Sequence, residues 1–152
     1  MIRRSVLVWL ALLLAYARIG HAQTPSIALD ATAAPAGGPI TAVIDGGPGN
    51  AGDFAGLYDA DGNAMQWLYL NGTQSLAASG ATGASITFML PTKPGTYHAC
   101  FFDASYRLIA TSGSVTTTAS SITLGASTGN PGVQVSAIVA NAPGWTGDWA
   151  GL

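Results

Sequence analysis

The sequence predicts an all-β protein, built as an antiparallel β-sandwich. After residue 22, short apolar segments alternate with turn signals rich in Gly, Pro, Asn and Asp, and no convincing helical periodicity is present. Several segments alternate apolar and polar residues, which lets one face of a strand be buried. A block of sequence also recurs after 95 residues. That period suits one sandwich domain per repeat.

Residues 1–22 are expected to form a signal peptide. A short positively charged segment precedes an apolar stretch that is too short to cross a bilayer with any margin. Gly20 and Ala22 are the small residues that signal peptidase requires, so we expect cleavage before Gln23, with a site after Ala17 as the alternative. An uncleaved signal anchor is the competing interpretation. Cleavage predicts an extracellular, cell-surface or periplasmic protein that has no membrane contact afterwards.

The charge of the exported chain excludes two classes of partner. Its 130 residues, 23–152, contain Lys93 and Arg107 against seven aspartates and no glutamate, so the net charge is 2 − 7 = −5. Nucleic acid and anionic membrane surfaces both require a basic patch on the protein. We therefore expect an unknown protein or glycan as the partner.

Four strands are expected in the first half of the first repeat, at residues 26–30, 39–45, 53–59 and 65–71. A segment rich in Pro and Gly separates the first two. Asp61-Gly62 lies between the third and fourth, and this dipeptide is typical of a tight hairpin turn.

Three strands are expected in the second half, at residues 85–90, 96–102 and 106–112. Ile86, Phe88 and Leu90 alternate onto one face of the first of them. Asn71-Gly72-Thr73 fits a glycosylation sequon, but Asn-Gly at the end of a strand is better explained as a tight turn.

The repeat divides the chain into domains. When Ser26 is aligned with Ser121, 13 of 32 positions are identical without a gap. The expected domains are 23–118, a linker at 119–120, and a second repeat at 121–152. The last residue matches Leu57, so we expect the second repeat to be incomplete and the full-length protein to carry further tandem domains.

The order of motifs resembles a known family. A Gly-Asp-Phe-Ala-Gly-Leu-Tyr phrase at 52–58 precedes a strand that contains Trp67, and Pro-Gly-Thr-Tyr follows at 94–97. This order resembles a bacterial immunoglobulin-like repeat, and the first phrase is similar to the Asp-Trp-x-Gly-Leu-Tyr strand motif of the SKICH β-sandwich. The resemblance covers residues 26 to about 118 and again 121–152. It implies an immunoglobulin-like sandwich in tandem array, in a secreted or surface protein attached to an enzyme or adhesin.

The repeated motif has expected structural roles. A carboxylate after glycine at a strand entrance can accept hydrogen bonds from free backbone N–H groups, and the aromatic beside it can fill the core between the sheets. The glycine two residues later leaves room for a close approach or a bulge. These roles fall to Asp53, Phe54 and Gly56 in the first repeat and to Asp148, Trp149 and Gly151 in the second. Tyr97 suits a tyrosine corner at the start of the penultimate strand.

The chain lacks a persuasive catalytic constellation. His98 and Cys100 lie two residues apart on one expected strand, about 7 Å from each other, whereas catalytic pairs normally come from separate elements. Cys100 has no partner for an intramolecular disulfide, and we expect a half-buried strand thiol. Asp59, Asp61 and Asn63 have too few of the features of a calcium loop. We expect no catalytic residue, no metal and no cofactor.

Trp67 and Tyr69 are the candidate contact residues. They share one face of residues 65–70, and Leu68 and Leu70 share the other. In a central strand the two aromatics would be core, which is the interpretation we favour, and in an edge strand they would form a platform for a sugar ring or a partner chain. The expected function is a non-catalytic spacer or adhesion-type binding module. The alternative is a carbohydrate-binding accessory module of a secreted glycan-active enzyme.

Overall fold

The computed structural model describes residues 23–151, so the expected signal peptide lies outside the described residues. Ten strands and no helix occur between residues 23 and 151. Accordingly, no helix in this range is long and apolar enough to cross a membrane. The strands are β1 (Ser26–Leu29), β2 (Ala33–Pro35), β3 (Pro39–Asp45), β4 (Phe54–Asp59), β5 (Ala64–Tyr69), β6 (Ala84–Met89), β7 (Gly95–Phe102), β8 (Leu108–Thr118), β9 (Ser121–Leu124) and β10 (Ala137–Ala140).

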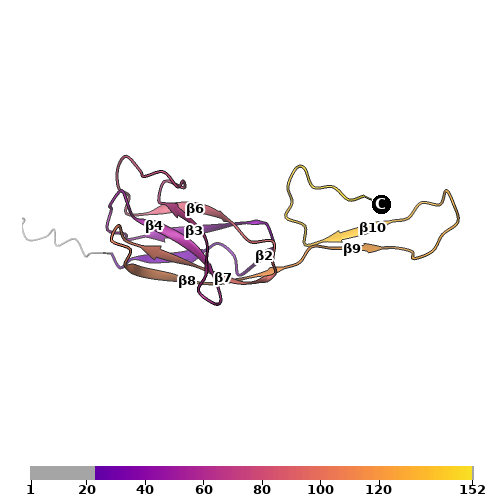
Figure 1. Ribbon diagram of the computed structural model, residues 1–152, viewed down its shortest axis with the longest axis horizontal. Coiled ribbons are helices and arrows are strands. Elements are labelled where there is room, and N and C mark those ends of the chain that lie inside the picture. The colour runs from indigo at the N-terminus through magenta and orange to yellow at the C-terminus, as the bar shows by residue number, and fades with distance from the viewer. Residues whose placement is uncertain (1–22, 152) are drawn as a thin grey trace, which may run out of the picture.

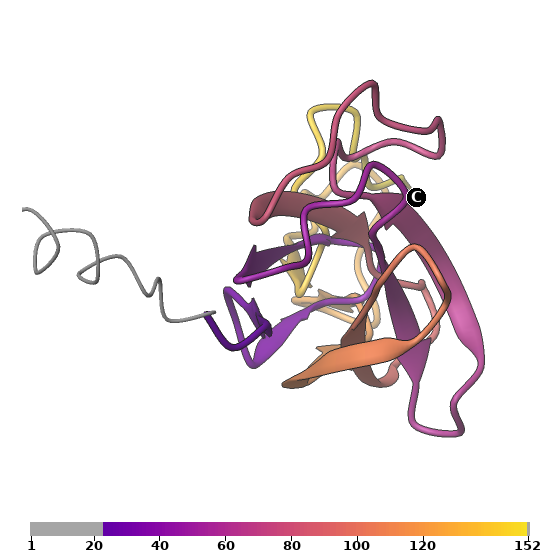
Figure 2. The same cartoon turned by 90° about the vertical axis from the view of Figure 1, so that its left-hand side faces the viewer.

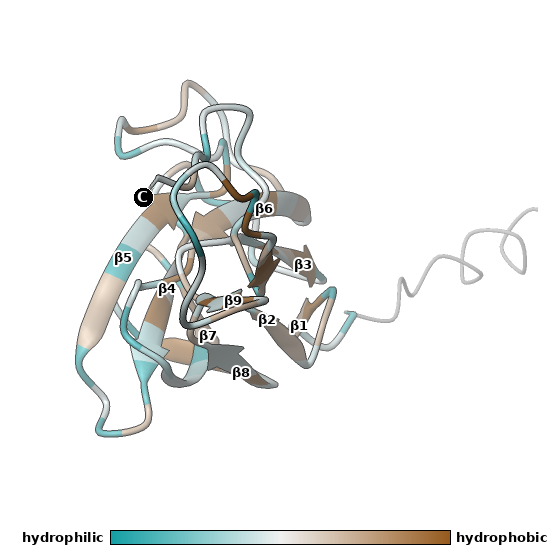
Figure 3. Cartoon of the chain, turned by 90° about the vertical axis from the view of Figure 1, so that its right-hand side faces the viewer, coloured by the Kyte–Doolittle hydropathy of each residue, from teal (hydrophilic) through white to brown (hydrophobic). Residues whose placement is uncertain are grey.

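The first eight strands form a two-layer sandwich, which confirms the predicted fold class. One sheet has three strands in the order β1-β3-β6, and the other has five in the order β2-β8-β7-β4-β5. Viewed along the long axis of the molecule, the two sheets face each other (Figure 2). β5 lies at an edge of the five-stranded sheet, with β4 as its only hydrogen-bonded neighbour among the described strands (Figure 3).

Strand alternation builds the core between the sheets. Along β3, Ile40, Ala42 and Ile44 are buried while the residues between them face outward. On the other strands that contribute to the core, the inward-facing apolar residues are buried in the same way. The remaining members of the core are Ile27, Ala55, Leu57, Leu68, Ile86, Phe88, Leu90, Tyr97, Ala99, Phe101 and Val115.

The structure differs from the expectation at β2 and β8. β2 was not expected, because Ala-Ala-Pro carries no alternation, and it forms only through pairing with Thr116–Thr118. This pairing is parallel, so the five-stranded sheet is mixed, whereas the other strand pairs among the described residues are antiparallel as expected. β8 begins two residues later than expected and runs on to Thr118, because Val115 is buried in the core and Thr117 is bound to Gly95.

The last two strands form a hairpin that extends away from the sandwich (Figure 1). Only Ala119 and Ser120 separate β8 from β9. β9 and β10 pair in the register that β1 and β3 use, shifted by 95 residues. Ile122 pairs with Val139 as Ile27 pairs with Ile44, and the other three pairs correspond in the same way.

The loops of the second repeat also reproduce those of the first. Gly132 and Gly144 have left-handed backbone angles, as do Gly37 and Gly49 at the matching positions. The amide of Asp148 donates to the carbonyl of Trp145, as the amide of Asp53 donates to that of Asn50. The repeat therefore extends from the sequence to local backbone geometry.

Candidate functional site

The outward face of the five-stranded sheet carries a groove lined by aromatic side chains, which we call the aromatic groove. Its volume is about 550 Å³, within the range usual for small-molecule sites. None of its lining residues is charged. They are Gly52, Phe54, Tyr58, Ala64, Trp67, Tyr69, Leu76, Phe102, Ala104 and Tyr106.

The register of three neighbouring strands gathers these rings. Phe54 on β4 is directly opposite Tyr69 on β5 and opposite Phe102 on β7. Since alternate residues of a strand share a face, Tyr58 and Trp67 lie on the same side of the sheet. The ring of Phe54 stacks on that of Phe102, with centroids 5.0 Å apart, and meets the ring of Trp67 edge to face at 6.3 Å.

Gly56 makes room for one of these rings. It is buried in the middle of β4, opposite Trp67 on one side and Cys100 on the other. A Cβ atom at this position would lie 2.8 Å from Cε2 of Tyr58, so a side chain here would displace the Tyr58 ring. The expectation for this glycine was room for a close backbone approach or a bulge, and the group that the missing side chain admits is the ring of Tyr58.

Asp53 links two chain segments at one end of the groove. Its carboxylate is fully buried and accepts hydrogen bonds from the Asn50 amide (2.8 Å), the Asn50 side chain (3.2 Å) and the Ala104 amide (3.0 Å). The last bond joins the loop before β4 to the turn between β7 and β8. Because Gly52 and Ala104 both line the groove, Asp53 sets the distance between two of its walls. The predicted capping role of Asp53 is confirmed.

Tyr106 is a groove residue that sequence reasoning missed. It lies in the turn between β7 and β8, is 79% exposed, and has its ring centroid 5.3 Å from that of Phe54. The sequence indicated a turn around Asp103, but nothing in it signals which side of the sheet the turn residues cover. This contact depends on the backbone angles of the turn.

The structure corrects three predictions about aromatic residues. The favoured core position of Trp67 and Tyr69 is wrong, because β5 is an edge strand, Trp67 is 39% exposed, and Tyr69 is only half-buried. Phe54 does not fill the core either, because it lies half-buried on the outward face. Its counterpart Trp149 is 87% exposed, which contradicts the same prediction for the second repeat.

Tyr97 makes the bond expected of a tyrosine corner. It is buried, and its hydroxyl donates a 2.8 Å hydrogen bond to the carbonyl of Lys93, four residues upstream. This bond fixes the chain where β7 enters the sheet. It therefore places the following outward residues of β7, which include the groove residue Phe102.

His98 and Cys100 lie on the groove side of β7, beside the groove rather than in its lining. The His98 ring lies 6.1 Å from the ring of Tyr58. Cys100 is 7% exposed, more deeply buried than expected, and the loss of hydration on burial raises the pKa of its thiol. A raised pKa suppresses the thiolate, which is the nucleophilic form.

Asp59, in the hairpin between β4 and β5, binds the backbone of its own turn. The Asp59 carboxylate accepts hydrogen bonds from the amides of Asp61 and Asn63 and from the Asn63 side chain. These bonds, the Asn63 side chain foremost, lower the pKa of Asp59. Within residues 23–151, no three His, Cys, Asp or Glu side chains gather in a way that could hold a metal ion.

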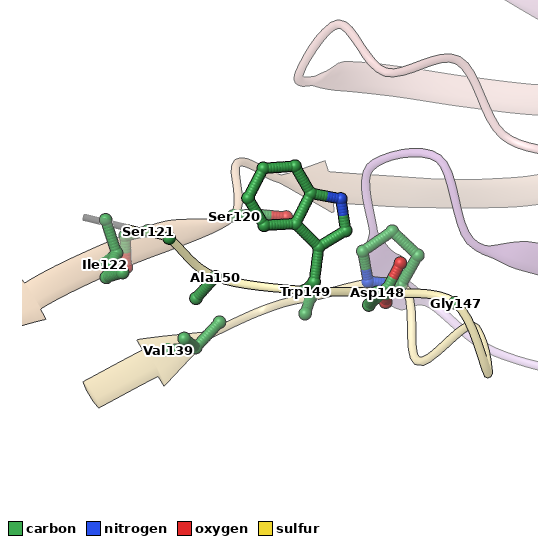
Figure 4. A pocket seen from close by; sticks show the side chains of 11 residues that line it. Ser120, Ser121, Ile122, Val139, Gly147, Asp148, Trp149 and Ala150 are labelled. Atoms are coloured by element: carbon green, nitrogen blue, oxygen red, sulfur yellow. The ribbon is translucent and has the colours of Figure 1, made fainter. Parts of the chain in front are cut away.

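A second hollow, of about 840 Å³, lies in the second repeat. Figure 4 shows Ile122 and Val139 on its two strands and Trp149 on the segment after β10. Ile122 is 52% exposed, whereas its counterpart Ile27 is 6% exposed in the sandwich core. The hollow therefore corresponds to the interior of the first repeat, and we do not regard it as a ligand site.

In comparisons with known proteins, no family model and no curated protein matches the chain.

Proposed function

We propose that the chain is a non-catalytic binding module of an exported protein, of the spacer or adhesion type, and that the aromatic groove is its ligand-contact surface. The observation that carries this proposal is the cluster of six aromatic side chains on one outward face, with Trp67 39% and Tyr106 79% exposed. Large aromatic side chains left in solvent carry a cost in hydration, and they dominate the energetics of interfaces when a partner covers them.

The scaffold beneath the groove supports a binding role. The floor residues Phe54 and Phe102 lie on two central strands, and Asp53 joins the loops at one end. A surface built on paired strands is already shaped before the ligand arrives, so little ordering entropy is lost on binding. The Cys100 thiol is poorly suited to nucleophilic catalysis, because it is buried and burial raises its pKa.

The test compares two substitutions on one strand. Trp67 lines the groove, whereas Met65 lies on the same strand, is similarly exposed at 41%, and is outside the groove lining. The labelled chain is applied to a mixed array of glycans and peptides. Trp67→Ala should reduce its binding about tenfold or more, which corresponds to about 1.4 kcal/mol. Met65→Ala should leave binding unchanged.

Two results would contradict the proposal. One is equal binding by wild type and Trp67→Ala, and the other is an equal loss in both variants. Thermal unfolding of each variant verifies that a loss of binding does not reflect a loss of the fold.

A further inference from the structure

Tyr106 has a backbone conformation that is unfavourable for its side chain. Its φ angle is 63°, in the left-handed region that suits glycine. Nine of the described residues have a positive φ, and seven of them are glycines. The other non-glycine is Asn141, and asparagine tolerates this region. In hairpin loops of this kind the left-handed position is normally given to glycine, so tyrosine here costs folding free energy.

The turn holds Tyr106 in this conformation through Asp103. The Tyr106 amide donates to the Asp103 carbonyl at 2.9 Å, and the Asp103 carboxylate accepts from the amides of Ser105 and Arg107 at 2.9 and 3.1 Å. Nε of Arg107 adds an ion pair to the same carboxylate at 3.0 Å. Five consecutive residues are thereby tied together around the tyrosine.

Burial does not compensate for the strain. The Tyr106 side chain is 79% exposed, and its edge contact with Phe54 leaves most of the ring in water. A glycine at this position would relieve the strain and lose little buried surface. Backbone strain that the fold does not require is concentrated at functional sites. The strained residue places its ring in the lining of the aromatic groove.

The lining of the groove defines the chemistry of a ligand. Its floor is apolar, and it has no charged side chain. Its polar side-chain groups are the hydroxyls of Tyr58, Tyr69 and Tyr106 and the indole N–H of Trp67. Tyrosine hydroxyls both donate and accept, so they match ligand hydroxyls, whereas a peptide rich in proline offers acceptors only.

We propose that the aromatic groove binds a neutral oligosaccharide, with the apolar face of a sugar ring against the aromatic floor, and that Tyr106 is a ligand-contact residue retained at the expense of stability. The inference rests on the proposed function of the groove. A sugar ring combines an apolar face with a rim of hydroxyls, as the lining requires. The net charge of −5 for residues 23–152 (2 − 7, from Lys93 and Arg107 against seven aspartates) adds repulsion against acidic glycans.

Isothermal titration calorimetry on the chain tests this with defined probes. The neutral probes are cellohexaose, xylohexaose, maltohexaose, mannohexaose and chitohexaose; hexagalacturonate and decaproline are the charged and peptide alternatives. At least one neutral hexasaccharide should bind. Tyr106→Gly should weaken its binding about tenfold while the Tm stays unchanged or rises, because the strain is relieved. Tyr106→Phe should lose less affinity, because it keeps the ring.

The outcomes separate this inference from the proposed function. Binding of decaproline or hexagalacturonate alone, abolished by Trp67→Ala, would overturn the inference and leave the groove as a binding surface. The absence of binding by every neutral hexasaccharide overturns it as well. If a hexasaccharide binds and Tyr106→Gly binds it as well as wild type does, the role of Tyr106 is disproved. If the Trp67→Ala variant also binds the hexasaccharide as well as wild type does, the proposed function of the groove is disproved too.

Discussion

The rings of Phe54 and Phe102 are stacked 5.0 Å apart with their planes within 9° of parallel, on the outward face of the sandwich. They come from neighbouring strands whose inward residues, Ala55 and Phe101, are fully buried in the core. One strand pair thus contributes to the core on one side and to the aromatic groove on the other. Substitutions on the two sides should differ in their effects.

Phe54→Ala should lower the free energy of unfolding by about 1–2 kcal/mol, because it removes the stacking with Phe102 and a ring that is only half-buried. Phe101→Ala is the matched control, and it should cost about 3–5 kcal/mol because the Phe101 ring is fully buried. Urea unfolding of both variants measures the difference. Equal losses would mean that Phe54 belongs to the core after all.

Asp53→Ala should lower the free energy of unfolding by about 3 kcal/mol, because it removes a fully buried carboxylate that accepts hydrogen bonds from the Asn50 amide, the Asn50 side chain and the Ala104 amide. Asp148→Ala removes the matching carboxylate of the second repeat, which accepts from the amides of Gly144 and Trp145 but is exposed. Water can replace it there, so the change should be within about 0.5 kcal/mol. Similar values for the two variants would contradict this account.

Stability should fall in acid partly through Asp103. Hydrogen bonds from the Arg107 amide, and next from its side chain, lower the pKa of Asp103 from its ordinary 3.8. The stabilisation is therefore complete above the unfolded-state pKa of 3.8 and is lost as the pH falls through the lower folded-state pKa. In the Asp103→Asn variant, the free energy of unfolding should depend less strongly on pH in the acid range. An unchanged acid slope in urea unfolding would contradict the prediction.

Cys100 should react slowly with iodoacetamide in the folded protein. Burial raises the pKa of its thiol and restricts access to the sulfur, and the thiolate is the reactive form. Mass spectrometry should find rapid labelling in urea and little labelling without it. Rapid labelling of the folded chain at neutral pH would indicate that β7 opens easily next to the groove.

Amide hydrogen exchange should differ sharply between the two hairpins that share a register. β3 pairs with strands on both sides and buries Ile40, whereas the counterpart of Ile40 in the second repeat, Val135, is 40% exposed. A two-stranded hairpin is marginally stable by itself. We expect slow exchange in β3 and fast exchange in β9 and β10. Equal protection in a monomer would show that the second hairpin is covered.

Sequence reasoning identified the parts of the site whose signals are local. Asp53 was recognisable because the same phrase returns at Asp148, and a carboxylate at a strand entrance has one obvious use. Gly56 was recognisable because it returns as Gly151, and Tyr97 because it follows Pro94-Gly95-Thr96 at the start of a strand. These residues act on atoms within a few positions along the chain or on the adjacent strand.

The face of β5 could not be assigned from sequence. Trp67 and Tyr69 alternate with Leu68 and Leu70, so both faces are apolar and either could be core. The choice follows from the position of β5 at the sheet edge, where Leu68 packs inward. Strand order is a long-range property that alternation does not encode. The contact between Tyr106 and Phe54 could not be predicted for the same reason.

The equal registers of β1–β3 and β9–β10 have a kinetic consequence. The two hairpins carry the same pattern of apolar residues, as in Ile27 and Ile122, and in the folded chain β1 and β3 are the ones that pack against β6, β7 and β8. A refolding chain therefore has two competitors for one docking surface, and the second is attached directly to the end of β8. Capture of the wrong hairpin, or of the hairpin from a neighbouring molecule, gives a trapped species that must unfold before the native pairing forms. We therefore expect the second copy of the hairpin to slow refolding of the sandwich.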